Sequence, residues 1–121
     1  MPRRLLIVED ETPLRHLLRD IFEGEGHEVV TAADGLEGWS RLTEGRFDLV
    51  LTNVLLPYLD GRELVRRIRA HPALRATPVV LMSANHPAMV EADGAAAFVA
   101  KPFDLDHLVG TIARVLDTAY P

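Results

Sequence analysis

The sequence predicts a single α/β domain built on a parallel sheet that helices cover on both faces. Short, continuous apolar runs alternate with amphipathic segments from one end of the chain to the other. Such runs are typical of strands buried on both faces, and their alternation with helices indicates a doubly wound sheet. The predicted strands are residues 5–8, 27–31, 48–52, 78–82 and 96–100. With 121 residues, the chain 1–121 is expected to form one domain around a single core.

Apolar residues at helical spacing fill the segments between these runs. Thr12 and Pro13 predict a helix start, with the threonine hydroxyl as the cap and the proline in the first turn. Gly24 and Gly26 are expected to end that helix. Further helices are predicted at residues 35–44, 61–70 and 105–116, the last one capped by Asp104. Residues 86–93 leave room for two helical turns at best, so a fourth helix would be short.

Composition and charge exclude several classes of function. The net charge of −5 provides no basic excess for neutralising phosphates, so direct nucleic-acid binding is not expected. The absence of cysteine excludes disulfides and thiol catalysis, and the five histidines lack the spacing of a zinc site. No apolar stretch reaches membrane-spanning length, and the first residues do not form a signal peptide. A cytoplasmic protein without membrane contact is expected.

Polar side chains stand where the predicted strands end. Glu9 and Asp10 follow the first strand, Asn53 the third, Ser83 the fourth and Lys101 the fifth. The carboxyl ends of parallel strands meet at one edge of the sheet, where functional groups of such folds gather. The sequence therefore predicts a polar pocket at this edge, although two acids at a strand end can also be plain solvated turn residues.

These segments together resemble the receiver domain of two-component response regulators. The resemblance rests on LLIVEDE (5–11), DLVLTNVLLPYLDG (48–61), Ser83 and KPF (101–103), and it covers essentially the whole chain. It implies a flavodoxin-like (receiver) fold, a strand order of 2-1-3-4-5 and a cis peptide bond before Pro102. The family is phosphorylated on an aspartate four residues before the proline of its D-x-x-[ML]-P-x-x-D-G segment. In this sequence that position is Asn53.

The resemblance assigns Glu9 and Asp10 to the family's acidic pair, which helps to hold magnesium. Carboxylate, amide and carbonyl oxygens suit this hard cation, so Asn53 and the Leu55 backbone would complete the site. Asn53 removes one of three negative charges, and we therefore expect magnesium to be bound weakly and not to be required. Asn53 is also able to donate a hydrogen bond to Asp10 through its NH2 group.

The other implied site residues are Ser83, Lys101 and Phe98. Ser83 matches the switch hydroxyl, although a strand-end serine that caps the next segment is the simpler interpretation. Lys101 matches the phosphate-binding lysine and is expected here to pair with Asp10. Phe98 matches the aromatic residue whose rotation reports activation. It lacks a hydroxyl and is able to bury completely, so an ordinary core role is an equal alternative.

The function expected from these features is a signalling and interaction module, not an enzyme, that cannot be phosphorylated at the usual position. Its expected partners are proteins, either a histidine kinase or a downstream signalling protein, and the family also allows a homodimer. The loss of the acceptor together with a fourth helix about one turn short favours natural drift away from phosphotransfer. A deliberate aspartate-to-asparagine change would explain only the first loss.

Two other functions remain as alternatives. A phosphorylation-competent regulator would need an unorthodox acceptor, for which Thr52 and Ser83 are the candidates. A flavin carrier with the same strand pattern would need a phosphate-binding loop after the first strand. That loop is acidic here, with Glu9, Asp10 and Glu11, and would repel phosphate.

Overall fold

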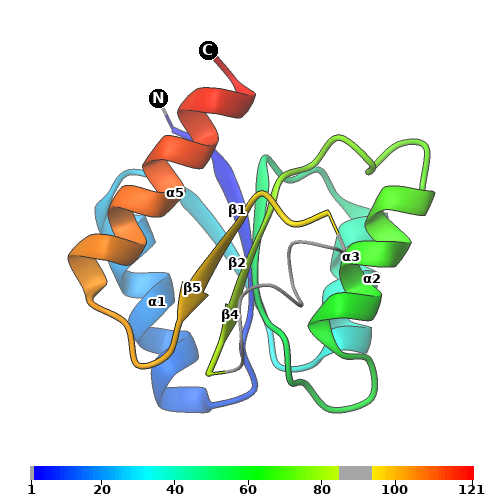
Figure 1. Cartoon of the computed structure of the whole chain (residues 1–121), viewed down its shortest axis with the longest axis horizontal. Helices are drawn as coiled ribbons and strands as arrows, with labels where there is room; N and C mark the ends of the chain where they lie inside the picture. The colour runs from blue at the N-terminus through cyan, green and yellow to red at the C-terminus, as the bar shows by residue number, and fades with distance from the viewer. Residues whose placement is uncertain (1, 85–93) are drawn as a thin grey trace.

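The computed structural model describes residues 2–84 and 94–121 and confirms the predicted sheet (Figure 1). Five parallel strands lie in the order β2-β1-β3-β4-β5. The strands are β1 Arg4–Val8, β2 Glu28–Ala32, β3 Leu49–Asn53, β4 Val79–Ser83 and β5 Ala97–Ala100. The helices among the described residues are α1 Thr12–Gly24, α2 Gly35–Glu44, α3 Gly61–Ala70 and α5 Leu105–Ala119. The predicted short fourth helix, at residues 86–93, lies outside the described residues.

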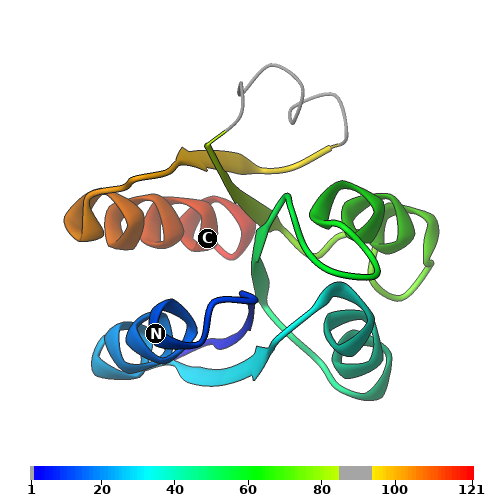
Figure 2. The same cartoon turned by 90° about the horizontal axis from the view of Figure 1, so that it is seen from below.

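Helices cover both faces of the sheet, with α1 and α5 on one side and α2 and α3 on the other (Figure 2). Alternate residues of each strand therefore enter different cores. In β1, Leu6 and Val8 pack toward α2 and α3, whereas Leu5 and Ile7 pack toward α1 and α5. No helix among the described residues is long and apolar enough to cross a bilayer.

Three strands, β2, β3 and β4, end one residue later than the sequence predicts, and in β3 and β4 this places a site residue inside the sheet. Asn53 pairs with Met82 at the end of β3, and Ser83 pairs with Ala100 at the end of β4. The ladder continues because the Val54 N–H donates to the Met82 carbonyl at 3.0 Å. Polar residues are tolerated at these positions because the backbone hydrogen bonds of the sheet are still made.

The helix starts agree with the sequence except at α1. Asp34, Asp60 and Asp104 cap α2, α3 and α5 by accepting from backbone N–H groups of the first turn. The predicted Thr12 cap is wrong, because Thr12 is already the first residue of α1. Glu11 occupies the cap position and makes no side-chain cap hydrogen bond.

The first residue of α3 lies directly against the end of β3. The Gly61 N–H donates to the Val54 carbonyl at 2.7 Å, and a Cβ on Gly61 would collide with the Asn53 carbonyl group and the Val54 backbone. Glycine is therefore needed here because two backbones approach each other closely. This contact fixes where α3 begins relative to Asn53.

We expect Gly61→Ala to lower the free energy of unfolding by about 1–3 kcal/mol, because backbone atoms cannot move away as side-chain ends can. Gly110→Ala in α5 is the matched control, since its Cβ would meet nothing within 4 Å. It should raise the free energy of unfolding by about 0.5–1 kcal/mol through helix propensity. Urea unfolding followed by circular dichroism measures both. Equal effects of the two substitutions would contradict the close contact.

Candidate functional site

The carboxyl edge of the sheet brings together four of the predicted site residues. Glu9 and Asp10 follow β1, Asn53 ends β3 and Lys101 follows β5. Glu9 is 1% exposed and Asn53 is 4% exposed, whereas Asp10 lies at the surface. The cluster therefore combines one carboxylate and one amide inside the protein with a second carboxylate at its mouth.

The Asn53 amide group joins the two acids. Its Nδ2 donates to Glu9 Oε2 at 2.6 Å and to Asp10 Oδ1 at 3.1 Å. The NH2 group, not the oxygen, must face these carboxylates, since an ionised carboxylate only accepts hydrogen bonds. The predicted hydrogen bond between Asn53 and Asp10 is present, and the shorter bond to Glu9 was not predicted. Hydrogen bonds to charged acceptors are roughly twice as strong as neutral ones.

Lys101 pairs with Glu9, and the predicted pairing of Lys101 with Asp10 is wrong. The Lys101 Nζ lies 3.1 Å from Glu9 Oε1, with the lysine side chain 28% exposed. The Glu11 N–H also donates to Glu9 Oε2 at 3.0 Å. The buried Glu9 carboxylate loses its hydration and needs a counter-charge, whereas Asp10 can remain solvated. The peptide bond between Lys101 and Pro102 is cis, as the resemblance predicts.

In this arrangement the oxygens of the two acids that face the pocket already have partners within the protein. Both oxygens of Glu9 already accept hydrogen bonds, and the NH2 group of Asn53 stands between Glu9 and Asp10. Asn53 Oδ1 is buried and has no hydrogen-bond partner among the described residues. This oxygen would ligate a cation at the acids only if the amide turned over. That rotation would break two charge-assisted hydrogen bonds.

The remaining predicted residues lie near this cluster. Ser83 is buried at the end of β4, and its carbonyl accepts from the Lys101 N–H at 2.9 Å. Leu55 follows the site in the loop after β3, with its side chain 69% exposed. Phe98 is partly buried and packs against the core on the α2 and α3 side.

Asp48, the other acid close to the third strand, lies at the opposite edge of the sheet. It precedes β3, its Oδ2 accepts from the Arg4 N–H at 2.8 Å, and its carbonyl accepts from the Tyr120 hydroxyl at 2.9 Å. Asp48 therefore takes no part in the cluster. The side chain of β3 that faces Glu9 and Asp10 is the uncharged amide of Asn53.

Two arginines with structural roles were missed by the sequence prediction. Arg15 of α1 donates to the Glu9 carbonyl at 2.9 Å and so helps to fix the turn that carries the acids. Arg69 of α3 donates through its guanidinium to the carbonyls of Arg75, Thr77 and Gly94. Helical spacing gives no signal for either contact, because the acceptors are backbone groups of other elements.

The shifted pKa values belong to the amino edge of the sheet. Burial, assisted by repulsion from Arg3, lowers the pKa of His27 below its ordinary value of 6.5. The His27 Nδ1 accepts from the Arg3 N–H at 3.1 Å, which requires the neutral ring. Burial, together with the Asp48 charge, raises the pKa of the Tyr120 hydroxyl, while Arg46 opposes this shift. Burial also lowers the pKa of Arg69.

Comparisons with known proteins agree on one family. A family model described as the response regulator receiver domain matches residues 5–113. The chain is 30% identical over 123 residues to the polar-differentiation response regulator DivK of Brucella anthropi, covering 98% of this chain and 100% of DivK. The chemotaxis response regulator CheY4 of Vibrio cholerae has a TM-score of 0.89 at 29% identity, covering 95% of this chain and 99% of CheY4.

A longer relative is also similar. The chain is 36% identical over 116 residues to YkoG of Bacillus subtilis (strain 168), named an uncharacterized transcriptional regulatory protein. The match covers 93% of this chain and 50% of YkoG, so the chain spans about half the length of that relative.

We expect Lys101→Met to lower the free energy of unfolding by about 3 kcal/mol, because it leaves the buried Glu9 carboxylate without its counter-charge. Glu28→Gln is the control, since it breaks the Arg4–Glu28 pair, whose side chains are 37% and 68% exposed. It should cost less than about 1 kcal/mol. Equal losses of unfolding free energy for the two variants, measured by urea unfolding, would show that burial of Glu9 does not determine the strength of the Glu9–Lys101 pair.

The lowered pKa of His27 predicts a pH dependence of stability. The folded state binds the His27 proton less readily than the unfolded state, so this contribution is complete above pH 6.5 and is lost as the pH falls below that value. His27→Asn should flatten the dependence of unfolding free energy on pH between about pH 5 and pH 7. His107→Asn, at an exposed position of α5, is the control. The prediction fails if His27→Asn leaves the wild-type slope unchanged.

Proposed function

Because this chain belongs to the response regulator receiver family, we propose that it is a signalling module that acts through protein contacts without aspartyl phosphorylation. The observation that carries this proposal is the Asn53 amide, which donates to Glu9 and Asp10. Asn53 stands four residues before Pro57, where the family's segment has its acceptor aspartate. The acid that would receive the phosphoryl group is therefore replaced by a group that binds the neighbouring acids.

The amide cannot take over the chemistry of a carboxylate. An aspartate attacks phosphorus with a charged oxygen and forms an acyl phosphate, as other covalent carboxylate catalysts do. The nitrogen lone pair of Asn53 is delocalised into the carbonyl group, and its oxygen carries no full charge. Both N–H bonds of the amide are also engaged by the acids, at 2.6 and 3.1 Å. The pocket is thus held together by its own hydrogen bonds.

Magnesium has a minor role in this proposal. Glu9, Asp10, a turned Asn53 and the Leu55 carbonyl would hold the cation and supply its oxygen ligands. The Lys101 ammonium, 3.1 Å from Glu9, already neutralises the buried acid. A cation would have to compete with this charge and with the Asn53 amide, so its affinity is weakened and signalling does not require it.

The chemistry of hydroxyl groups argues against phosphorylation on an unorthodox residue. Hydroxyl nucleophiles need an adjacent base for activation. The Thr52 hydroxyl instead donates to the Asn53 carbonyl at 3.1 Å, and Ser83 lies buried at the end of β4.

Exposed apolar side chains beside the site support a protein partner. Leu55 and Tyr58 lie in the loop after β3, with 69% and 82% of their surfaces exposed. Tyr58 also has a positive φ of 69°, a conformation that costs energy in a bulky residue. A histidine kinase, a downstream signalling protein or a second copy of the chain docking at this edge would cover both side chains.

The test is incubation with acetyl phosphate and magnesium, followed by intact-mass measurement. The wild-type protein should gain no phosphoryl mass, because it has no carboxylate at position 53. Asn53→Asp should gain one phosphoryl group, and Asn53→Asp combined with Lys101→Met should not. A hydroxylamine-labile adduct on the wild-type protein would refute the proposal. Peptide mapping would assign any stable adduct to Thr52 or Ser83.

A further inference from the structure

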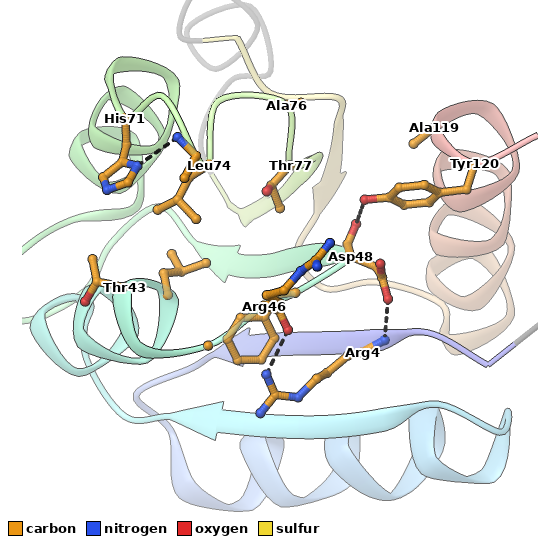
Figure 3. Close-up of a pocket in the computed structure, with 14 residues that line it drawn as sticks. Arg4, Thr43, Arg46, Asp48, His71, Leu74, Ala76, Thr77, Ala119 and Tyr120 are labelled. Atoms are coloured by element: carbon orange, nitrogen blue, oxygen red, sulfur yellow. Dashed lines mark hydrogen bonds between the residues drawn. The ribbon is translucent and has the colours of Figure 1, made fainter.

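A depression of about 750 Å³ opens at the amino edge of the sheet, on the side opposite Asn53 (Figure 3). Its walls come from the end of α2, the loop before β3, the loop after α3 and the end of α5. Sites for small molecules usually measure about 300–1,000 Å³. The volume therefore suits a small organic ligand and has no part in the site described above.

Four loop carbonyls at or beside this depression already accept hydrogen bonds from side chains. The carbonyls of Arg75 and Thr77 accept from Arg69, and the Arg46 carbonyl accepts from Arg4. The Asp48 carbonyl accepts from Tyr120. These four carbonyls are therefore less available to a ligand.

The charged residues that line the depression are one acid and two arginines. Asp48 keeps its negative charge, because the Arg4 N–H that binds its Oδ2 at 2.8 Å is a neutral donor. The Arg4 guanidinium already has partners, because it pairs with Glu28 at 2.6 Å and lies 4.4 Å from the centre of the Phe47 ring. The two arginines nevertheless outnumber the one acid among the described lining residues.

Arg46 is the charged donor that remains. Its side chain is exposed, and within the described part of the chain its guanidinium makes no hydrogen bond or ion pair. Figure 3 shows the side chain extending among the lining residues, near Asp48. Its charge is felt at the Tyr120 hydroxyl, which places it within electrostatic reach of the α5 wall. A guanidinium offers a planar set of N–H groups that fits carboxylate and phosphate.

Part of the wall beside Arg46 is apolar. Leu42 and Leu74 are buried beneath the depression, and Phe47 and Tyr120 contribute aromatic rings. Pockets of this kind combine apolar walls with a few polar groups that orient the ligand. The Arg46 guanidinium has no partner among the described residues, and it lies beside an apolar part of the wall. From these two features we infer that this depression binds a small organic anion, with a carboxylate or phosphate group on an apolar body. The inference does not depend on the role of Asn53.

The test uses phenyl phosphate, benzoate and the neutral benzyl alcohol as probes of the ¹⁵N-labelled full chain. Both anions should cause saturable shifts of amide signals around Arg46, Thr77 and Tyr120, and benzyl alcohol should bind about tenfold more weakly because it lacks the charge-assisted hydrogen bond. The tighter of the two anions identifies the head group. Shifts confined to other regions, or equal binding of benzyl alcohol, would overturn the inference.

Variants separate this site from general attraction of anions. Arg46→Gln should weaken phenyl phosphate binding about tenfold, and Ala76→Trp should abolish it by filling the depression from an exposed lining position. Arg19→Gln removes the same charge from α1 and should leave binding unchanged. Loss of binding in Arg19→Gln equal to that in Arg46→Gln would also overturn the inference. The amide spectrum of each variant verifies that it is folded.

Discussion

The buried Glu9 carboxylate is the constraint on which the arrangement of the carboxyl edge depends. Removing an ionised acid from water is costly unless charge and hydrogen bonds replace its hydration. Glu9 is 1% exposed, and three groups meet this need: the Lys101 ammonium, the Asn53 amide and the Glu11 N–H. These groups come from three separate segments of the chain. The acid therefore fixes the ends of β1, β3 and β5 relative to one another.

The exchange of a carboxylate for an amide at position 53 changes charge without changing shape. A third acid beside Glu9 and Asp10 would repel both, and a bound divalent cation would offset this repulsion. The Asn53 NH2 group instead brings hydrogen-bond donors to both acids. We therefore interpret the pocket as one in which groups of the protein itself, and not a metal ion, balance the two acids. In the function proposed above, the Asn53 amide would make position 53 unreactive toward a phosphodonor and would also reduce the need for a metal ion.

The two edges of the sheet differ in which polar groups lack a hydrogen-bond partner among the described residues. At the carboxyl edge an amide oxygen, Asn53 Oδ1, is buried without a hydrogen-bond partner among the described residues. At the amino edge Arg69, Arg4 and Tyr120 donate to four backbone carbonyls, and the Arg46 guanidinium has no partner in the described part of the chain. The edges are separated by the length of the strands. Chemistry at one edge therefore makes no direct contact with the other.

The sequence by itself determined the fold class. Apolar runs and helical spacing depend only on residues close together in the chain, so the ends of the five strands and four described helices were predicted to within three residues. The sequence also placed Asp48 at the amino end of its strand, away from the other acids. The residue at position 53 can also be read directly from the sequence, because the third apolar run predicts which residue lies at the carboxyl edge of the sheet.

Only the tertiary structure decided which partners these residues take. Lys101 pairs with Glu9 and not with Asp10, because Glu9 is buried and Asp10 is exposed. Two adjacent acids in a sequence do not reveal which of them will be buried. The same holds for Arg69, whose acceptors are carbonyls of two distant loops, and for the depression around Arg46. Burial and backbone acceptors arise from packing between elements, and no local pattern of side chains encodes them.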